Sequence, residues 1–235
     1  MPVIDVQGVT HTYGDGPNRR VVLRDVTVTL TEQRIGVIGA NGSGKSTFVR
    51  LLNGLAIPTQ GMVGVDGLDT RKQAREIRKR VGFCFTDPNS QIVMPTVAED
   101  VAFGLRRRGL SKPEITAKVR ATLERYGLAD HADHPAHLLS GGQKQLLALS
   151  SVLVTDPDVL VLDEPTTLLD LRNAAIVQRV VRDLPHQVLL VTHHLDLLDR
   201  FERVLVFDDA CLVYDGRPDD AVAYYRDLMD RQVPR

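Results

Sequence analysis

A glycine-rich segment, Gly39–Ser46, has the residue types and spacing of a phosphate-binding loop, GxxxxGK[ST]. Its glycines leave backbone N–H groups bare, so consecutive N–H groups at a helix N-terminus can surround an anion. Lys45 supplies charge for the β and γ phosphates, Ser46 offers a hydroxyl to Mg²⁺, and Thr47 can donate to the α phosphate. The residues predicted to bind nucleotide here are Gly39, Ala40, Asn41, Gly42, Ser43, Gly44, Lys45, Ser46 and Thr47.

Two adjacent carboxylates, Asp163 and Glu164, follow the apolar run Val159–Leu162. Such a run predicts a buried strand, and its carboxyl end is the edge where open parallel sheets bind ligands. Asp163 resembles the Walker B aspartate that holds Mg²⁺ through its water shell, and Glu164 is placed to polarise an attacking water as general base. The alternative is a solvated strand end. His193, at the end of another apolar run, can hydrogen-bond a γ phosphate.

A second loop, Leu139–Gln143 with the sequence LSGGQ, predicts a second anion site. Two glycines follow Ser140, which is a natural N-cap for the helix after it. One nucleotide does not need two such loops, so the second one requires a separate explanation.

In these motifs the chain resembles the ATP-binding cassette (ABC) ATPases, whose LSGGQ signature it matches letter for letter. The resemblance spans essentially the whole chain, with the motifs in family order. It implies that the signature loop of one subunit closes over ATP held by the phosphate loop of another, in a head-to-tail dimer. The residues to which it gives roles are the trans signature loop Ser140, Gly141, Gly142 and Gln143, the adenine-stacking Tyr13, the dimer-loop acid Asp170 and the switch histidine His193.

One position departs from the family pattern. The family usually places a glutamine after a phenylalanine at the junction between lobes, but Phe85 is followed here by Thr86. A threonine hydroxyl can ligate Mg²⁺ or water, yet it reaches less far than an amide on a longer stem. The metal contact of Thr86 therefore stays open, and Gln91 is a candidate to compensate. We hypothesise that Thr86 weakens turnover but not ATP binding.

The segment from Asp87 to Gly104 is similar to ATPases of energy-coupling factor importers, which take up cobalt, nickel, biotin and other vitamins. This resemblance implies membrane-embedded partner subunits docked near residues 86 to 104, where Glu99 or Asp100 can meet arginines. A helix cap with solvated acids is the alternative for these two residues. The cargo and the choice between homodimer and heterodimer are not readable from the sequence.

Two rival functions have sequence signatures that can be checked. A soluble ABC ATPase acting in repair, translation or cluster assembly is the main alternative, but the long insertions or tandem cassettes typical of that class do not fit 235 residues. A small-molecule kinase with a phosphate loop leaves LSGGQ unexplained.

The elements that must position these motifs predict an α/β fold: a P-loop NTPase with a RecA-like parallel-sheet core, an antiparallel β lobe and an α-helical signature lobe. Pro2–Thr10 and Val21–Leu30 predict a hairpin, Arg34–Gly39 a buried strand, and Ser46–Leu55 a helix. We interpret residues 1–235 as a single ABC ATPase domain with a helical insertion at about 87–150, where Ser111–Glu114 forms a capping box. VLVFDDACLVYDG predicts a second hairpin before a final helix.

Composition sets the remaining expectations. A formal charge of -1 argues against a global field for nucleic acid, and 43% hydrophobic residues suit a folded protein. Neither a secretory signal nor an apolar run long enough for a membrane span is visible in the sequence. We therefore expect a cytoplasmic protein, peripheral on the inner face of the cell membrane through its partners, with ATP and Mg²⁺ as cofactors.

Overall fold

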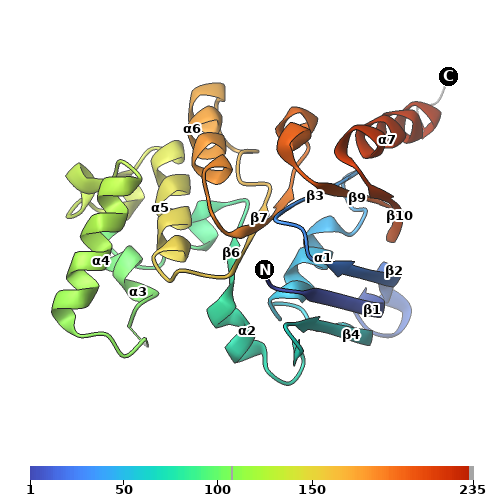
Figure 1. The fold of residues 1–235 in the computed structure, drawn as a ribbon, viewed down its shortest axis with the longest axis horizontal. Coiled ribbons are helices and arrows are strands. Elements are labelled where there is room, and N and C mark those ends of the chain that lie inside the picture. The colour runs from blue at the N-terminus through green and yellow to red at the C-terminus, as the bar shows by residue number, and fades with distance from the viewer. Residues whose placement is uncertain (107, 233–235) are drawn as a thin grey trace. The chain divides into compact units, whose positions relative to one another are not determined.

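The computed structural model describes residues 1–106 and 108–232 and separates the chain into two compact units. Unit 1 comprises Met1–Val81, Asp158–Asp163 and the chain from His186 onward, and unit 2 comprises Gly82–Pro157 and Glu164–Pro185. Figure 1 shows the helices and strands of both units. In the described residues, no helix has both the length and the apolar character needed to cross a bilayer.

Unit 1 contains an antiparallel sheet with the strand order β2-β1-β4-β5. The predicted N-terminal hairpin is confirmed, with its strands shifted slightly from the predicted ranges to β1 (Ile4–Tyr13) and β2 (Arg20–Leu30). On the other side of β1 lies β4 (Gln60–Val65), which the sequence analysis did not predict, followed by β5 (Leu68–Asp69). Gly61 and Gly64 weaken the strand pattern of β4, which is why its signal is faint.

The parallel part of unit 1 carries the strands that end at the predicted site. β3 (Arg34–Gly39) lies between β8 (Gln187–Val191) and β9 (Arg203–Asp208), parallel to both, and β7 (Val159–Asp163) pairs in parallel with β8. Every residue of β7 and β8 is buried, as the continuous apolar runs predicted. The second predicted hairpin is also confirmed, because β9 pairs antiparallel with β10 (Cys211–Gly216).

Helices complete unit 1. α1 (Lys45–Leu52) follows β3 and ends earlier than predicted, and α2 (Ala74–Arg80) leads to β6 (Val81–Cys84). The final helix, α7 (Pro218–Gln232), packs against β9 and β10, where Ala221 is buried with Val204 and Val206.

Unit 2 is helical and has its own apolar core. Its helices are α3 (Val97–Phe103), α4 (Lys112–Arg125), α5 (Gly141–Leu153) and α6 (Leu171–Arg182). α3, α4 and α5 pack against one another around Val101, Leu123 and Leu147 (green and yellow in Figure 1). Ser111 and Glu114 form the predicted capping box at the start of α4. The predicted helical segment 87–150 lies within unit 2, whereas α6 had not been placed by the sequence.

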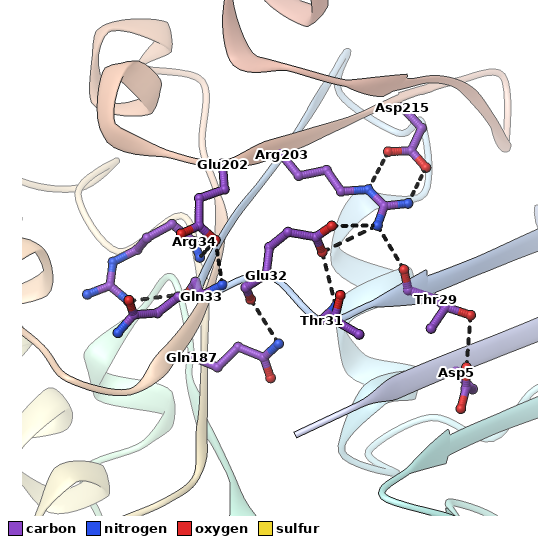
Figure 2. A network of polar contacts seen from close by, with 10 residues as sticks. All are labelled: Asp5, Thr29, Thr31, Glu32, Gln33, Arg34, Gln187, Glu202, Arg203 and Asp215. Atoms are coloured by element: carbon purple, nitrogen blue, oxygen red, sulfur yellow. Dashed lines mark hydrogen bonds and ion pairs between the residues drawn. The ribbon is translucent and has the colours of Figure 1, made fainter. Parts of the chain in front are cut away.

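A polar network in unit 1 joins the end of the antiparallel hairpin to β9 and β10 (Figure 2). The Arg203 guanidinium donates to both carboxylate oxygens of Asp215 at 2.6 Å, to Glu32 at 3.0 Å and to the carbonyl oxygen of Thr29 at 2.8 Å. One side chain of β9 therefore satisfies groups from the end of β2, from the loop that leads into β3, and from β10.

Candidate functional site

The phosphate loop joins β3 to α1 inside unit 1. Its last glycine, Gly44, is the N-cap of α1 with φ of 106°, and a Cβ there would overlap the carbonyl oxygen of Val22. Glycine is thus required at this position both by conformation and by close approach. Lys45 is buried, and its Nζ donates to the carbonyl oxygens of Gly39 and Ala40 at 2.8 Å each. The loop wraps around the ammonium group that sequence analysis assigned to the phosphates.

Ser46 and Asp163, which are far apart in sequence, meet at the start of α1 and the end of β7. The Ser46 hydroxyl donates to Asp163 Oδ1 at 2.8 Å, and Arg50 Nη2 lies 3.5 Å from Asp163 Oδ2. The Asp163 residue is only 1% exposed, so its carboxylate needs these partners. The predicted phosphate loop and the predicted metal-binding acid therefore form one contiguous polar site in unit 1.

The oxygens of this site fit Mg²⁺. Mg²⁺ prefers hard oxygen ligands and is commonly held by one or two protein groups together with water and substrate phosphates. A serine hydroxyl beside a buried carboxylate provides such a set. Over residues 1–106 and 108–232, the His, Cys, Asp and Glu side chains make no cluster of three or more able to hold a metal on their own.

Tyr13 ends β1 and is 46% exposed, which leaves its ring accessible for stacking. Its neighbour on the strand, His11, is buried and packs edge-on against it, with ring centroids 4.7 Å apart. Burial lowers the pKa of His11, so this imidazole is neutral at pH 7. His11 supports the ring of Tyr13 from one side, and the sequence analysis had not singled it out.

His193 follows Thr192 beyond the end of β8 and is exposed, as a phosphate-sensing residue at the ligand edge of the sheet would be. The Thr192 hydroxyl accepts a hydrogen bond from the backbone N–H of His194 at 2.9 Å. His194 is the N-cap residue of the 3₁₀ turn η5 (Leu195–Arg200). The Thr192 side chain thereby holds the turn around His193.

The signature loop lies in unit 2, where Ser140 is the N-cap of α5 as predicted. Ser140 and Gln143 form a reciprocal capping box: the Gln143 backbone N–H donates to Ser140 Oγ at 3.3 Å, and the Ser140 N–H donates to Gln143 Oε1 at 2.9 Å. Because the box uses these two N–H groups, Gly141 and Gly142 provide the other bare N–H groups at the N-terminus of α5.

Asp170 is the N-cap of α6, a role that the sequence analysis did not foresee. Its Oδ1 accepts from the backbone N–H of Asn173 at 2.8 Å, and its Oδ2 accepts from the Asn173 side-chain amide at 3.1 Å. The same Asn173 side chain fills the space beside Gly142, where an added Cβ would overlap it. The predicted dimer-loop acid and the signature loop are thus linked through one asparagine.

Glu164 turns the chain directly after β7 and has a positive φ of 53°, which is uncommon for a residue other than glycine. Its Oε2 accepts a hydrogen bond from the Thr167 hydroxyl at 3.1 Å, and its backbone oxygen accepts from the Thr167 N–H at 3.3 Å. Such a conformation is kept only where surrounding contacts hold it, and it is often found at functional sites.

The side-chain amide of Gln91 bonds to the protein backbone and does not compensate for Thr86. Its Oε1 accepts from the Phe85 N–H at 3.1 Å, and its Nε2 donates to the Ala148 carbonyl oxygen at 2.8 Å. Gln91 directly follows the 3₁₀ turn η2 (Pro88–Ser90). Through these two hydrogen bonds, the Gln91 amide anchors the segment that contains Thr86 against α5.

Asp100 is not available to meet an arginine of a partner. It is 3% exposed, and its carboxylate accepts from the Val93 N–H, the Met94 N–H and the Ser151 hydroxyl at 2.9, 3.1 and 2.8 Å. Glu99 is exposed and forms a capping box with Thr96 at the start of α3. The helix-cap alternative is confirmed for Glu99, whereas Asp100 holds the preceding backbone from within.

Comparison with protein families gives a match over residues 23–167 to a model described as ABC transporter. A putative ABC transporter ATP-binding protein of Deinococcus radiodurans is 53% identical, with 97% of this chain and 99% of that protein covered. The biotin transport ATP-binding protein BioM of Rhizobium etli is 51% identical, over 89% of this chain and 93% of that protein. The energy-coupling factor transporter ATP-binding protein EcfA1 of Symbiobacterium thermophilum is 42% identical, over 94% of this chain and 82% of that protein.

Solved structures agree with these matches. CbiO1 of Clostridium perfringens, described as part of the ABC transporter complex CbiONQ, superposes with a TM-score of 0.81 at 29% identity, over 97% of this chain and 93% of that chain. An ATP-binding cassette was solved as a dimer in a post-hydrolysis state, with ADP and phosphate bound. It has the same TM-score of 0.81 at 26% identity, over 92% of this chain and 98% of that chain.

Proposed function

We infer that this chain, which belongs to the ABC transporter family of ATP-binding proteins, is the ATP-hydrolysing subunit of an importer of the energy-coupling factor type. The comparisons confirm the family, the fold class and the ATPase activity predicted from the sequence. The observation that carries the function is the hydrogen bond between Ser46 and Asp163, because it joins the phosphate loop to a metal-binding acid. We further propose that residues 1–235 act as one ABC ATPase domain.

The phosphate loop is proposed to hold ATP with Mg²⁺. Lys45 now donates to two loop carbonyls, and the charged phosphate oxygens are stronger acceptors that would draw the ammonium toward them. Ser46 and Asp163 would hold Mg²⁺, which supplies Lewis-acid stabilisation of phosphate charge. The exposed ring of Tyr13 would stack on adenine.

Glu164 and His193 are proposed to act on the γ phosphate. Glu164 would accept a proton from the attacking water as general base, and its positive φ sets the direction in which its side chain leaves the strand. His193 would donate a hydrogen bond to the γ phosphate. The hydroxyl of Thr86 is the candidate to replace the usual glutamine at the metal.

A head-to-tail dimer is proposed because the signature loop offers a second anion site. Ser140, Gly141 and Gly142 at the N-terminus of α5 would approach the γ phosphate on the partner, with Gln143 fixing the loop and Asp170 facing the interface. ATP then stabilises the closed dimer by contacts that ADP lacks, and hydrolysis reopens it. The dimeric cassette with ADP and phosphate supports this arrangement.

The membrane partner is proposed from the relatives. Proteins named for biotin transport and for energy-coupling factor transport are similar over most of this chain, and CbiO1 is described as part of a transporter complex. These names favour transport over repair, translation or cluster assembly. The segment 86–104, where Val93 is 62% exposed, would receive a helix of a membrane subunit and hold the chain on the inner membrane face. A vitamin such as biotin, or cobalt or nickel, is the proposed cargo class.

Size-exclusion chromatography with ATP tests the proposed function. We expect Glu164→Gln to bind ATP without hydrolysing it and to elute as a dimer in ATP and as a monomer in ADP, because only the γ phosphate bridges the loops. Lys45→Ala in the same background is expected to weaken ATP binding and to abolish the dimer. A Glu164→Gln protein that binds ATP yet stays monomeric at every concentration would refute the dimer mechanism.

A further inference from the structure

Two histidines outside the predicted site lie beside the signature loop in unit 2. His131 ends the 3₁₀ turn η3 (Ala129–His131), and its Nε2 lies 2.8 Å from Gln143 Nε2. Its other ring nitrogen, Nδ1, lies 2.7 Å from Nδ1 of His134. A continuous chain of hydrogen bonds therefore runs from the signature glutamine through both imidazole rings.

The direction of this chain follows from the capping box. The Gln143 Oε1 accepts from the Ser140 N–H, so the Nε2 of the same amide is the donor toward His131. His131 Nε2 must then be an unprotonated acceptor, and His131 Nδ1 must carry the proton that it donates to His134. Both rings have to be neutral for every bond of the chain to exist.

The backbone fixes the place of the two rings. The Val97 N–H donates to the His134 carbonyl oxygen at 3.2 Å, and the Ala98 N–H donates to the Ala132 carbonyl oxygen at 2.9 Å. The segment that carries the histidines is thus bonded to the start of α3. His131 reaches Gln143 from a supported position, so the contact can hold the signature loop in place.

We propose that His131 is a positioning residue of the signature loop, which it holds through Gln143 only while its imidazole is neutral. Protonation at Nε2 would place an N–H against the Gln143 amide N–H₂, and the bond would be replaced by repulsion. The inference rests on the proposed function, since the loop is useful only if it closes on a partner's nucleotide. Protonation of His131 would then weaken ATP-driven dimer closure.

Charged groups on the surrounding elements bond to residues other than the two histidines. Glu99 of α3 bonds to Thr96, Lys144 of α5 donates to Asn89, and Glu124 of α4 pairs with Arg120. The acidic residues on the histidine segment itself are Asp130 and Asp133. These two carboxylates are the negative charges nearest in sequence to the rings.

The test measures the ATP-dependent dimer in a Glu164→Gln background at pH 6, 7 and 8. His131→Leu removes the acceptor and is expected to raise the protein concentration for half-dimerisation about 4- to 100-fold at pH 8, because each dimer loses one hydrogen bond at each of its two signature loops. His131→Gln can place its Oε1 where Nε2 was, so it should restore dimerisation at pH 8 and remove the loss toward pH 6. His137→Ala, an exposed histidine on the following turn, is the matched control and should keep the parent's pH dependence.

The outcomes separate the two proposals. ATP affinity of the monomeric variants, measured with a fluorescent ATP analogue, should not change, because the loop acts on the partner's nucleotide. If the parent dimerises with ATP but His131→Leu and His131→Gln match it at every pH, His131 does not position the loop. If His131→Gln behaves as His131→Leu at pH 8, the acceptor role is refuted. If the parent never dimerises, the proposed function has failed instead.

Discussion

Gly141 and Gly142 are neighbours in the signature loop, but the structure gives them different surroundings. A Cβ added to Gly142 would overlap the side chain of Asn173, whose own Cβ would lie 2.8 Å from it. Nothing lies within 4 Å of a Cβ added to Gly141. Gly142 is buried and Gly141 is exposed. At one position glycine is required by packing against α6, and at the other only a ligand would require it.

Gly142→Ala is therefore expected to lower the free energy of unfolding by about 1–3 kcal/mol, because the added methyl forces Asn173 aside. Gly141→Ala should change it by about 0.5 kcal/mol or less. Urea unfolding at pH 7 measures both. Equal stability losses in the two variants would contradict the packing argument, and Asn173→Ala should recover part of the loss when combined with Gly142→Ala.

Thr86 offers a second test at single-residue scale. If its short side chain limits turnover, Thr86→Gln should raise the ATP hydrolysis rate about 2- to 10-fold and leave ATP affinity unchanged. Gln91 stays bonded to Phe85 and Ala148 in this variant, so the segment should keep its conformation. Steady-state hydrolysis and equilibrium nucleotide binding check the two parts, and an unchanged rate would reject the hypothesis.

Among the elements, β9 is tied to its surroundings by one ion-pair network (Figure 2). Hydrogen bonds to Asp215 raise the pKa of Arg203, so the guanidinium is charged at every pH at which the protein is folded. Burial by itself would raise the pKa of Glu32, but hydrogen bonds from the Thr31 and Glu32 backbone and from Arg203 outweigh it and lower the pKa below its ordinary 4.5. The folded state therefore favours the ionised form of Glu32.

This shift predicts a pH-dependent stability. A carboxyl with a lowered folded pKa stabilises the fold fully above its unfolded pKa, and the contribution is lost as pH falls through the folded value. Glu32→Gln should lower the free energy of unfolding by about 1–2 kcal/mol at pH 7, a figure that already allows for the partial exposure of Glu32. The stability difference between the parent and Glu32→Gln should shrink below about pH 4.5. Glu76→Gln, whose exposed pair with Lys79 spans 3.7 Å, is the control and should cost less than about 0.5 kcal/mol. Urea unfolding midpoints of the parent and Glu32→Gln at pH 7 and pH 4 test this. A stability difference that does not change with pH would contradict the stabilising role of ionised Glu32.

At the scale of the whole molecule, each chain carries a phosphate loop in unit 1 and a signature loop in unit 2. Two identical chains, or this chain and a related one, can each supply the half that the other's nucleotide needs. A contact that is made by both loops of both chains is isologous and closes as a dimer. ATP concentration would then control the oligomeric state.

Cross-linking tests this arrangement. With Cys84 and Cys211 replaced by serine, a chain with Asn41→Cys and a chain with Ser140→Cys are mixed in a Glu164→Gln background. Both substituted positions are exposed, and a short bismaleimide should join the two chains in ATP and fail to do so in ADP. Ser111→Cys in place of Ser140→Cys is the control and should not cross-link. Nucleotide-independent cross-linking would contradict ATP-driven closure.

Much of the fold could be predicted because its signals are local. The buried runs of β7 and β8, the capping box of α4 and the glycine-rich turn before α1 depend on residues close together in sequence. β4 could not be predicted, because its glycines mask the strand pattern and its stability comes from pairing with β1. Asp100 also misled the sequence analysis, since a carboxylate in a helix's first turn reads as solvated until its three donors are seen.

The sequence by itself determined the motifs of this protein: the phosphate loop, the paired acids after β7 and LSGGQ are contiguous, and together they resemble the ABC ATPases. Only the tertiary structure decided which groups those residues contact. It brought Ser46 to Asp163, engaged Gln91 with Ala148, and placed His131 on Gln143. A hydrogen bond depends on distance and direction, and for residues remote in sequence both are set by how the chain packs.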